Sequence, residues 1–168
     1  MILATGNQVR LRNIGVRDLK TAAKHPFTLS VTEALTDPKR LRVIYDRNGF
    51  WTEDAGAVAI EVGERLVGTL QFYRAGATIH GYELNYILHD EDDTGKGYAS
   101  EALRLFCDLL FAQRPGCHRL QMIVKIDDYR SARLAEACRF ASEGVLRKAR
   151  YASEDEPGDC SVYSMVRD

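Results

Sequence analysis

A short glycine-rich segment, Thr94–Ala99 (TGKGYA), carries the pattern in this sequence that most suggests ligand chemistry. Gly95 and Gly97 permit positive φ angles, so backbone N–H groups can point outward with no Cβ in the way. A helix predicted to begin near Tyr98 would add free amides and the positive end of its dipole. Such a group of N–H donors binds phosphate oxygens. An ordinary glycine-rich turn between a strand and a helix explains the glycines equally well.

Two familiar nucleotide-binding loops do not fit this segment. The P-loop requires GxxxxGK[ST], and the sequence contains nothing of that form. The Rossmann fingerprint requires a third glycine where Ser100 stands, near the start of the fold rather than late in it. Its acidic ribose-binding residue could only be Asp127 or Asp128. The sequence therefore disfavours dinucleotide binding.

Hydrophobic periodicity predicts the elements that position this segment. Residues 82–89 alternate between two faces, which predicts a strand. One face of that strand carries Glu83, Asn85, Ile87 and His89. After Gly97 the period becomes that of an amphipathic helix, which ends at Pro115-Gly116, and a strand follows at 119–126. The glycine-rich segment thus opens the helix of a βαβ unit.

The remaining pattern predicts a mixed α/β sheet, antiparallel early in the chain and parallel at the βαβ crossover. The other predicted elements are a first strand at 8–14, helices at 16–23 and 38–48, a hairpin of strands at 57–62 and 65–73, a helix at 128–138, and a closing hairpin at 144–151 and 160–166 around an acidic loop at 153–159. No repeat or flexible linker interrupts the order, so we expect a single domain over residues 1–168.

Composition narrows the class of protein. The chain has 168 residues, 45% of them hydrophobic, and a net charge of −1, a balance that argues against sequence-independent nucleic-acid binding. No apolar run is long enough to span a membrane, and no signal peptide is apparent. Cys107, Cys117, Cys138 and Cys160 match neither a zinc site nor a CxxC motif. We therefore expect reduced thiols, no bound metal, no membrane partner and a cytoplasmic location.

Two segments of the sequence resemble a known family. The first, YELNYILHDEDDTGKGYASEAL at 82–103, resembles motif A of the GNAT superfamily of N-acetyltransferases, closest to the branch that acetylates ribosomal-protein N-termini. The second, at 128–144, is similar to the NxxS…GF..EG segment of the same family. The resemblance implies a mostly antiparallel twisted sheet with a central βαβ unit and a splayed pair of parallel strands.

The resemblance also implies a ligand, coenzyme A, with acetyl-CoA as the acyl donor and no metal. In the family pattern the amides of the glycine-rich segment hold the pyrophosphate, and the strand backbone before it runs beside pantetheine. The residues matched to this role are Ile87, Leu88, His89, Thr94, Gly95, Lys96, Gly97, Tyr98, Ala99, Asp128 and Ser131.

The implied reaction is direct acetyl transfer to a primary amine, either a small molecule or a protein N-terminus, with both substrates bound together. A base must first deprotonate the amine. Glu83 is the predicted base, although a charged residue on a wet sheet face would look the same. His89 is a second candidate, with a solvated loop histidine as its alternative. The acidic run at 90–93 is interpreted as a solvated face.

The sequence departs from the family pattern at three positions. Ala135 stands where many relatives carry a tyrosine that protonates the thiolate. Asp128 replaces an asparagine, and we expect it to cap a helix. Arg139 replaces a glycine that ends the helix in a left-handed conformation, at a cost of about 1 kcal/mol. These departures keep a non-catalytic acyl-CoA-binding module open as an alternative. We expect a monomer or a homodimer.

Overall fold

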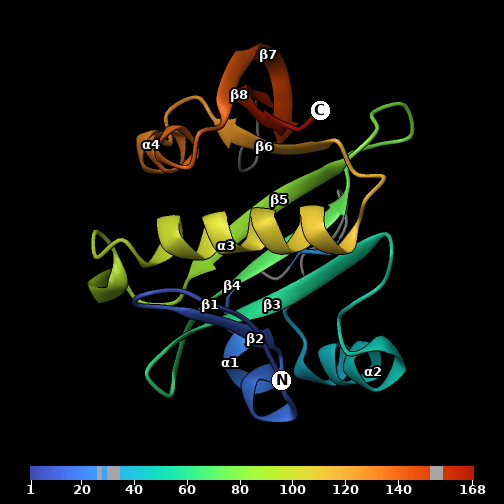
Figure 1. Ribbon diagram of the computed structural model, residues 1–168, viewed down its shortest axis with the longest axis vertical. Coiled ribbons are helices and arrows are strands. Elements are labelled where there is room, and N and C mark those ends of the chain that lie inside the picture. Colours follow the sequence, from blue (N-terminus) through green and yellow to red (C-terminus); the bar gives the residue numbers. More distant parts are fainter. Residues whose placement is uncertain (26–27, 30–34, 152–156) are drawn as a thin grey trace.

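The computed structural model of the protein describes residues 1–25, 28–29, 35–151 and 157–168 (Figure 1). Within these residues, eight strands form one sheet in the order β1-β2-β3-β4-β5-β6-β8-β7. The strands are β1 (Ile2–Thr5), β2 (Arg10–Asn13), β3 (Ala55–Val62), β4 (Arg65–Arg74), β5 (Tyr82–Leu88), β6 (Arg119–Lys125), β7 (Ala141–Tyr151) and β8 (Pro157–Val166). The α-helices are α1 (Leu19–Ala22), α2 (Pro38–Asn48), α3 (Tyr98–Gln113) and α4 (Tyr129–Ala137).

Two hydrophobic cores lie on opposite faces of the sheet. Figure 1 shows α3 lying across the middle strands, while α1 and α2 gather at the other end of the molecule. One core joins β2–β6 to α3 and α4, and its most buried residues include Phe72, Phe106 and Leu120. The second core is smaller and joins α1 and α2 to Ala57 and Ala59 of β3. Alternation along each strand therefore decides which face a side chain reaches.

Strands β5 and β6 are the parallel pair of the sheet, and they separate early. They are paired only at Tyr82↔Leu120 and Glu83↔Gln121, whereas β6 stays paired with β8 from Arg119 to Lys125. At the closed end, Gly81 has a φ of +128°, and a Cβ there would lie 2.3 Å from the Arg119 carbonyl oxygen. Glycine thus permits the close approach that starts the pair. The predicted α/β fold with a splayed parallel pair is confirmed.

Several element boundaries differ from the sequence prediction, and three of these differences have a clear basis in the structure. The N-terminal segment forms two strands instead of one, because the chain turns at Gly6, whose N–H donates to the Val9 carbonyl. The helix predicted at 16–23 begins with a 3₁₀ turn, and its α-helical part is limited to α1. The predicted acidic loop was drawn too long, because Pro157–Asp159 already belong to β8, paired with β7. The rest of the predicted loop, residues 153–156, lies outside the described residues.

Candidate active site

The glycine-rich segment Thr94–Ala99, called the cradle below, has the conformation that its composition predicts. Gly95 and Gly97 have φ angles of +78° and +84°, and Gly97 is the N-cap of α3. No side chain caps the start of this 16-residue helix. Its first amides therefore remain available to an anion, and the helix dipole adds positive potential at the same point.

The acidic run before the cradle is not uniformly solvated, so the interpretation of 90–93 as a solvated face was wrong for its last member. Asp93 is buried and accepts two hydrogen bonds of 2.7 Å from Arg65. Lys96 Nζ lies 3.8 Å from the same carboxylate. The Arg65 hydrogen bonds are the main reason that the pKa of Asp93 is lowered. The ion pair offsets the negative charge beside the cradle and ties the loop to β4.

A cavity of 210 Å³ opens over the cradle, and helix α4 contributes two arginines to it. Its lining residues are Tyr86, Leu88, Asp93, Thr94, Gly95, Gly97, Tyr98, Ala99, Ser100, Arg130, Arg133 and Leu134. Arg130 and Arg133 were not among the predicted site residues. Their spacing of three places them on one side of a helix, which was the available signal. Two guanidinium groups beside free amides favour a phosphate-bearing ligand.

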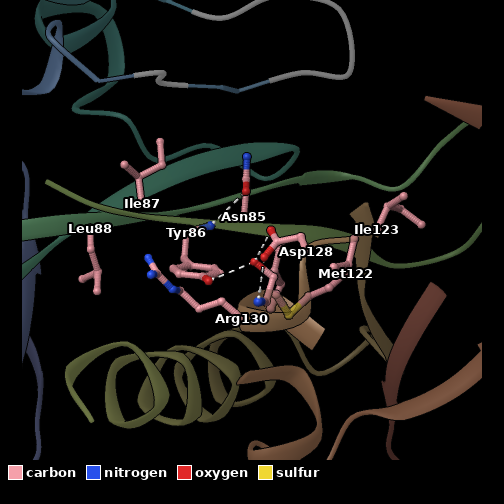
Figure 2. Close-up of a pocket in the computed structure, with 11 residues that line it drawn as sticks. Asn85, Tyr86, Ile87, Leu88, Met122, Ile123, Asp128 and Arg130 are labelled. Atoms are coloured by element: carbon pink, nitrogen blue, oxygen red, sulfur yellow. Dashed lines mark hydrogen bonds between the residues drawn. The ribbon is translucent and has the colours of Figure 1, made fainter. Parts of the chain in front are cut away.

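A second cavity, of 370 Å³, occupies the gap where β5 and β6 separate, and it is called the cleft below (Figure 2). It is lined by Leu84, Asn85, Tyr86, Ile87, Leu88, Met122, Ile123, Val124, Asp128, Arg130 and Ser131. Tyr86, Leu88 and Arg130 line both cavities. The cradle and the cleft are therefore neighbouring parts of one site that crosses from α3 to the sheet.

The backbone of β5 presents alternate residues to the cleft. His89 N–H donates to the Val67 carbonyl at 2.9 Å, and residues facing each other across antiparallel strands alternate between bonded and non-bonded pairs. Residues 83, 85, 87 and 89 therefore exchange hydrogen bonds with β4, and the N–H and C=O groups of 84, 86 and 88 point toward the gap. Of the three residues predicted to supply backbone contacts, Leu88 is the one oriented to do so.

Glu83 lies at the last paired position before β5 and β6 separate. Its carboxylate accepts a hydrogen bond of 2.9 Å from the Tyr73 hydroxyl. Tyr73 pairs with Ala55 of β3 in the strand register, and alternation places both it and Glu83 on the face that carries α1 and α2. The structure thus puts a half-buried carboxylate at the closed end of the cleft, on the face away from α3.

His89 lies elsewhere. It stacks on His25 with ring centroids 4.1 Å apart, and burial together with His25 lowers its pKa to about 4. Both its ring nitrogens are buried without a hydrogen-bond partner among the described residues. His89 lies six positions beyond Glu83, a distance of roughly 20 Å along an extended chain. His89 is therefore a packed, neutral histidine rather than a solvated loop residue, and it lies far from the closed end of the cleft.

The start of α4 brings hydroxyl groups to the cleft. Asp128 is the N-cap, as predicted, and accepts from Ser131 N at 3.0 Å and from Ser131 Oγ at 2.7 Å. The Tyr86 hydroxyl lies 2.9 Å from Ser131 Oγ, and Figure 2 shows the Tyr86 ring extending from β5 toward Asp128 at the start of α4. Burial raises the pKa of Tyr86 above its usual value. By contrast, Ala135 is fully buried in the core, where a tyrosine would overpack its neighbours.

Comparison with known proteins identifies the fold and the family. A family model described as an acetyltransferase (GNAT) domain matches residues 9–141, most of the chain. The chain belongs to the GNAT acetyltransferase family. The predicted resemblance is therefore confirmed, and the protein is an N-acetyltransferase of the class that uses acetyl-CoA. No curated protein matches the sequence at a significant level.

Solved structures share the fold of this acetyltransferase over nearly its whole length. A GNAT acetyltransferase from Bacillus anthracis has 19% identity and a TM-score of 0.76, with 99% of this chain and 98% of that chain covered. The Vibrio cholerae spermidine/spermine N-acetyltransferase has 18% identity and a TM-score of 0.77, with 95% and 92% covered. A ribosomal L7/L12 α-N-protein acetyltransferase in complex with coenzyme A has 20% identity and a TM-score of 0.74, with 99% and 98% covered.

Across residues 1–25, 28–29, 35–151 and 157–168, no three His, Cys, Asp or Glu side chains gather as a metal site would require. Within the same residues, no helix is both long enough and apolar enough to cross a membrane.

Proposed function

We propose that the acetyltransferase moves an acetyl group directly from acetyl-CoA to a primary amine while both substrates are bound. One observation carries the proposal: the cleft between β5 and β6 continues into the cradle on one side, and on the other it begins just beyond Glu83↔Gln121, the last pair of the two strands. A donor and an acceptor that meet at the end of this cleft can react without a covalent enzyme intermediate. The acceptor is a small-molecule amine or a protein N-terminus.

The residues present suit coenzyme A. The pyrophosphate would be held by the amides of Gly95–Ala99, with Thr94, Lys96 and Tyr98 around it and Arg130 and Arg133 supplying charge. The backbone of Leu84, Tyr86 and Leu88 would bind pantetheine as an added strand. Asp128 and Ser131 line the same cleft and bound it at the start of α4.

The protein's own groups perform the remaining steps. Glu83 takes a proton from the acceptor ammonium group, directly or through water, so that the nitrogen can attack the thioester carbonyl. Backbone N–H groups of β5 that point toward the cleft stabilise the charge that develops on the carbonyl oxygen. A donor bound between the two strands would displace water from the cleft, which would strengthen these interactions.

Calorimetry tests coenzyme A binding. We expect one site per chain, and we expect Gly97→Glu to abolish binding, because a carboxylate in the cradle repels phosphate and its side chain fills the space that the ligand needs. Gly116→Glu is the matched control, since a Cβ there meets nothing within 4 Å and lies outside the cradle. Unchanged affinity in a folded Gly97→Glu variant would refute the cradle.

Turnover with acetyl-CoA and a panel of amines and peptides, followed by thiol release, tests catalysis. Coenzyme A binding without acetylation of any member of the panel would favour a non-catalytic acyl-CoA-binding module, the alternative that the alanine at position 135 keeps open.

A further inference from the structure

Acetyl transfer leaves coenzyme A as a thiolate, and the residues that line the cleft limit what can protonate it. Among those residues, the uncharged O–H groups belong to Tyr86 and Ser131. Asp128 accepts hydrogen bonds from Ser131, and Arg130 is 61% exposed and lies 3.4 Å from Glu91. Asn85 points to the opposite side of β5 from Tyr86 (Figure 2).

The hydrogen-bond network distinguishes the two hydroxyl groups. An ionised Asp128 can only accept, so the Ser131 hydroxyl donates its single proton to Asp128 at 2.7 Å. The Tyr86 hydroxyl, 2.9 Å from Ser131 Oγ, must then be the donor in the second bond. The Ser131 proton is committed to a charged partner, whereas the Tyr86 proton is held by a neutral oxygen and is the easier of the two to redirect.

Acid strength favours the same residue. A phenol has an ordinary pKa of about 10 and a thiol one of about 8.5. Burial raises the pKa of Tyr86 above its ordinary value, but its hydroxyl is still a far stronger acid than the aliphatic hydroxyl of serine. A proton donor is most effective when its acidity is close to that of the group it serves. Tyr86 also lies where the cradle meets the cleft, so a ligand that occupies both must pass its ring.

We propose that Tyr86 is the catalytic residue that protonates the departing thiolate, a role that rests on the acetyl transfer proposed above. When the C–S bond breaks, its electron pair stays on sulfur, and the sulfur takes the proton of the Tyr86 hydroxyl. The nitrogen, which carries an extra proton after its attack, releases that proton to solvent as the amide forms, and the phenolate regains a proton from solvent before the next turnover. Ser131 and Asp128 hold the hydroxyl in position between turnovers. In this proposal, Tyr86 of β5 supplies the proton that a tyrosine on α4, at the position of Ala135, supplies in many relatives.

The first test is Tyr86→Phe, which keeps the ring and removes the O–H group. We expect kcat to fall by about 100-fold, the lower end of what a general acid contributes, while coenzyme A affinity changes less than about threefold. Tyr82→Phe is the matched control. It lies on the same strand, and its hydroxyl donates to the Glu53 carbonyl at 2.8 Å, away from the cleft. It should lose a comparable hydrogen bond and keep its kcat.

A second measurement separates an acid from a structural group. Replacing Tyr86 with 3-fluorotyrosine preserves the hydroxyl but makes it more acidic. The alkaline limb of the kcat profile should then move to lower pH, with Asp128 and Arg130 as the charged neighbours that affect the titration. A tyrosine that only packs would leave the limb in place.

Two results would overturn the role proposed for Tyr86. Full turnover in a folded Tyr86→Phe variant, or an unmoved alkaline limb in the fluorotyrosine protein, overturns it while leaving the proposed function intact. We expect Ser131→Ala to lower kcat less than tenfold, and a 100-fold loss there with normal turnover in Tyr86→Phe would assign the proton to Ser131. A wild-type chain that binds coenzyme A but acetylates no amine overturns the proposed function and this inference with it.

Discussion

At the scale of single residues, β5 presents an ionisable side chain to each face of the sheet. Glu83 and Tyr86 are three positions apart on a strand, so alternation sends their side chains in opposite directions. Glu83 bonds Tyr73 on the face of α1 and α2, while Tyr86 bonds Ser131 on the face of α3 and α4. In the proposed reaction, the base and the acid would therefore approach from opposite faces of the same strand.

Glu83→Gln tests the base. The amide keeps the shape and the contact with Tyr73 but cannot accept a proton, so we expect kcat to fall by at least about 100-fold. Coenzyme A affinity should stay within about threefold, and the acidic limb of the kcat/KM profile should flatten or shift. Steady-state kinetics across pH provides both readouts.

Glu143→Gln is the control for the loss of a carboxylate on the same sheet. Glu143 is held by Arg119 at 2.6 Å and by Ser164, away from the closed end of the cleft. Normal turnover is expected in this variant. Near-normal turnover and an unchanged profile in Glu83→Gln would instead make Glu83 a sheet residue without a catalytic role.

Glu143 should also make the free energy of unfolding depend on pH. Its hydrogen bond from Arg119, and then that from Ser164, lower the pKa of Glu143 from 4.5 to about 2. A lowered pKa stabilises the fold above pH 4.5, and that contribution is lost as pH falls from 4.5 toward 2. We expect a contribution below about 1 kcal/mol, because the side chain is 40% exposed. Urea unfolding of wild type and Glu143→Gln should differ at pH 7 and converge toward pH 2.

Alternation alone predicted that Glu83 shares one face of its strand with Asn85, because strand period is a local property. Other features depend on residues far apart in the chain. Asp93 looks like its three exposed acidic neighbours until Arg65, 28 positions away, is known to reach it. The contact between Tyr86 and Ser131 joins residues 45 positions apart, and no local pattern announces it.

At the scale of elements, both helices that border the site end or begin with an unusual residue. Gly97 at the start of α3 leaves amides uncapped, which suits ligand binding. Arg139, just beyond α4, has a φ of +67°, as the family's glycine at this position implied. The Phe140 N–H donates to the Ala135 carbonyl, which is how a left-handed residue closes a helix. The end of α4 therefore has the usual geometry of a helix C-terminus, but an arginine occupies the left-handed position that glycine adopts at lower cost.

Arg139→Gly should relieve this strain. A side chain in the left-handed region costs about 1–2 kcal/mol, and the greater freedom of glycine in the unfolded chain returns part of that gain. We expect the free energy of unfolding to rise by about 0.5–1 kcal/mol in urea titrations. Arg133→Gly, in the helical interior of α4, is the matched control and should destabilise the protein by a similar amount. A less stable Arg139→Gly variant would mean that the arginine makes contacts outweighing its strain.

Element order was predictable because hydrophobic period changes visibly at each boundary, as it does after Gly97. The division of the N-terminal segment into β1 and β2 was not. Its turn depends on Glu101 of α3, whose carboxylate accepts hydrogen bonds from the backbone amides of Asn7 and Gln8. A helix about ninety residues away thus shapes this turn.

At the scale of the whole molecule, the site lies where the two parts of the sheet meet. β1–β5 form one antiparallel part, and β6, β8 and β7 form the other. The β5–β6 register joins them directly at two positions, and α3 contacts both α4 and the first strands. A ligand in the cleft therefore touches both parts at once. This arrangement could be predicted only through the family resemblance, because strand separation leaves no periodic trace in the sequence.

Coenzyme A occupying a preformed site should stabilise the fold. At a free concentration of 100 times Kd, the expected gain is about 2.7 kcal/mol, which for a chain of this size raises Tm by roughly 5–10 °C. Gly97→Glu should show no shift, whereas Gly116→Glu should shift like wild type. Thermal denaturation at several ligand concentrations provides the measurement. A shift that persists in Gly97→Glu would place the binding site elsewhere.

The short β5–β6 register also makes the free protein locally soft. The N–H groups of Tyr86 and Leu88 point toward a gap instead of a neighbouring strand, and the matching edge of β6 is likewise unpaired with β5 beyond Gln121. The Tyr86 N–H donates to the Asn85 side chain at 3.1 Å, whereas the Leu88 N–H has no strand partner in the gap among the described residues and should exchange readily with solvent. Pantetheine laid along that edge would stand in for the missing strand segment. If coenzyme A binds there as proposed, the donor substrate would also complete the sheet, so hydrogen exchange at Leu88 should slow when coenzyme A is added.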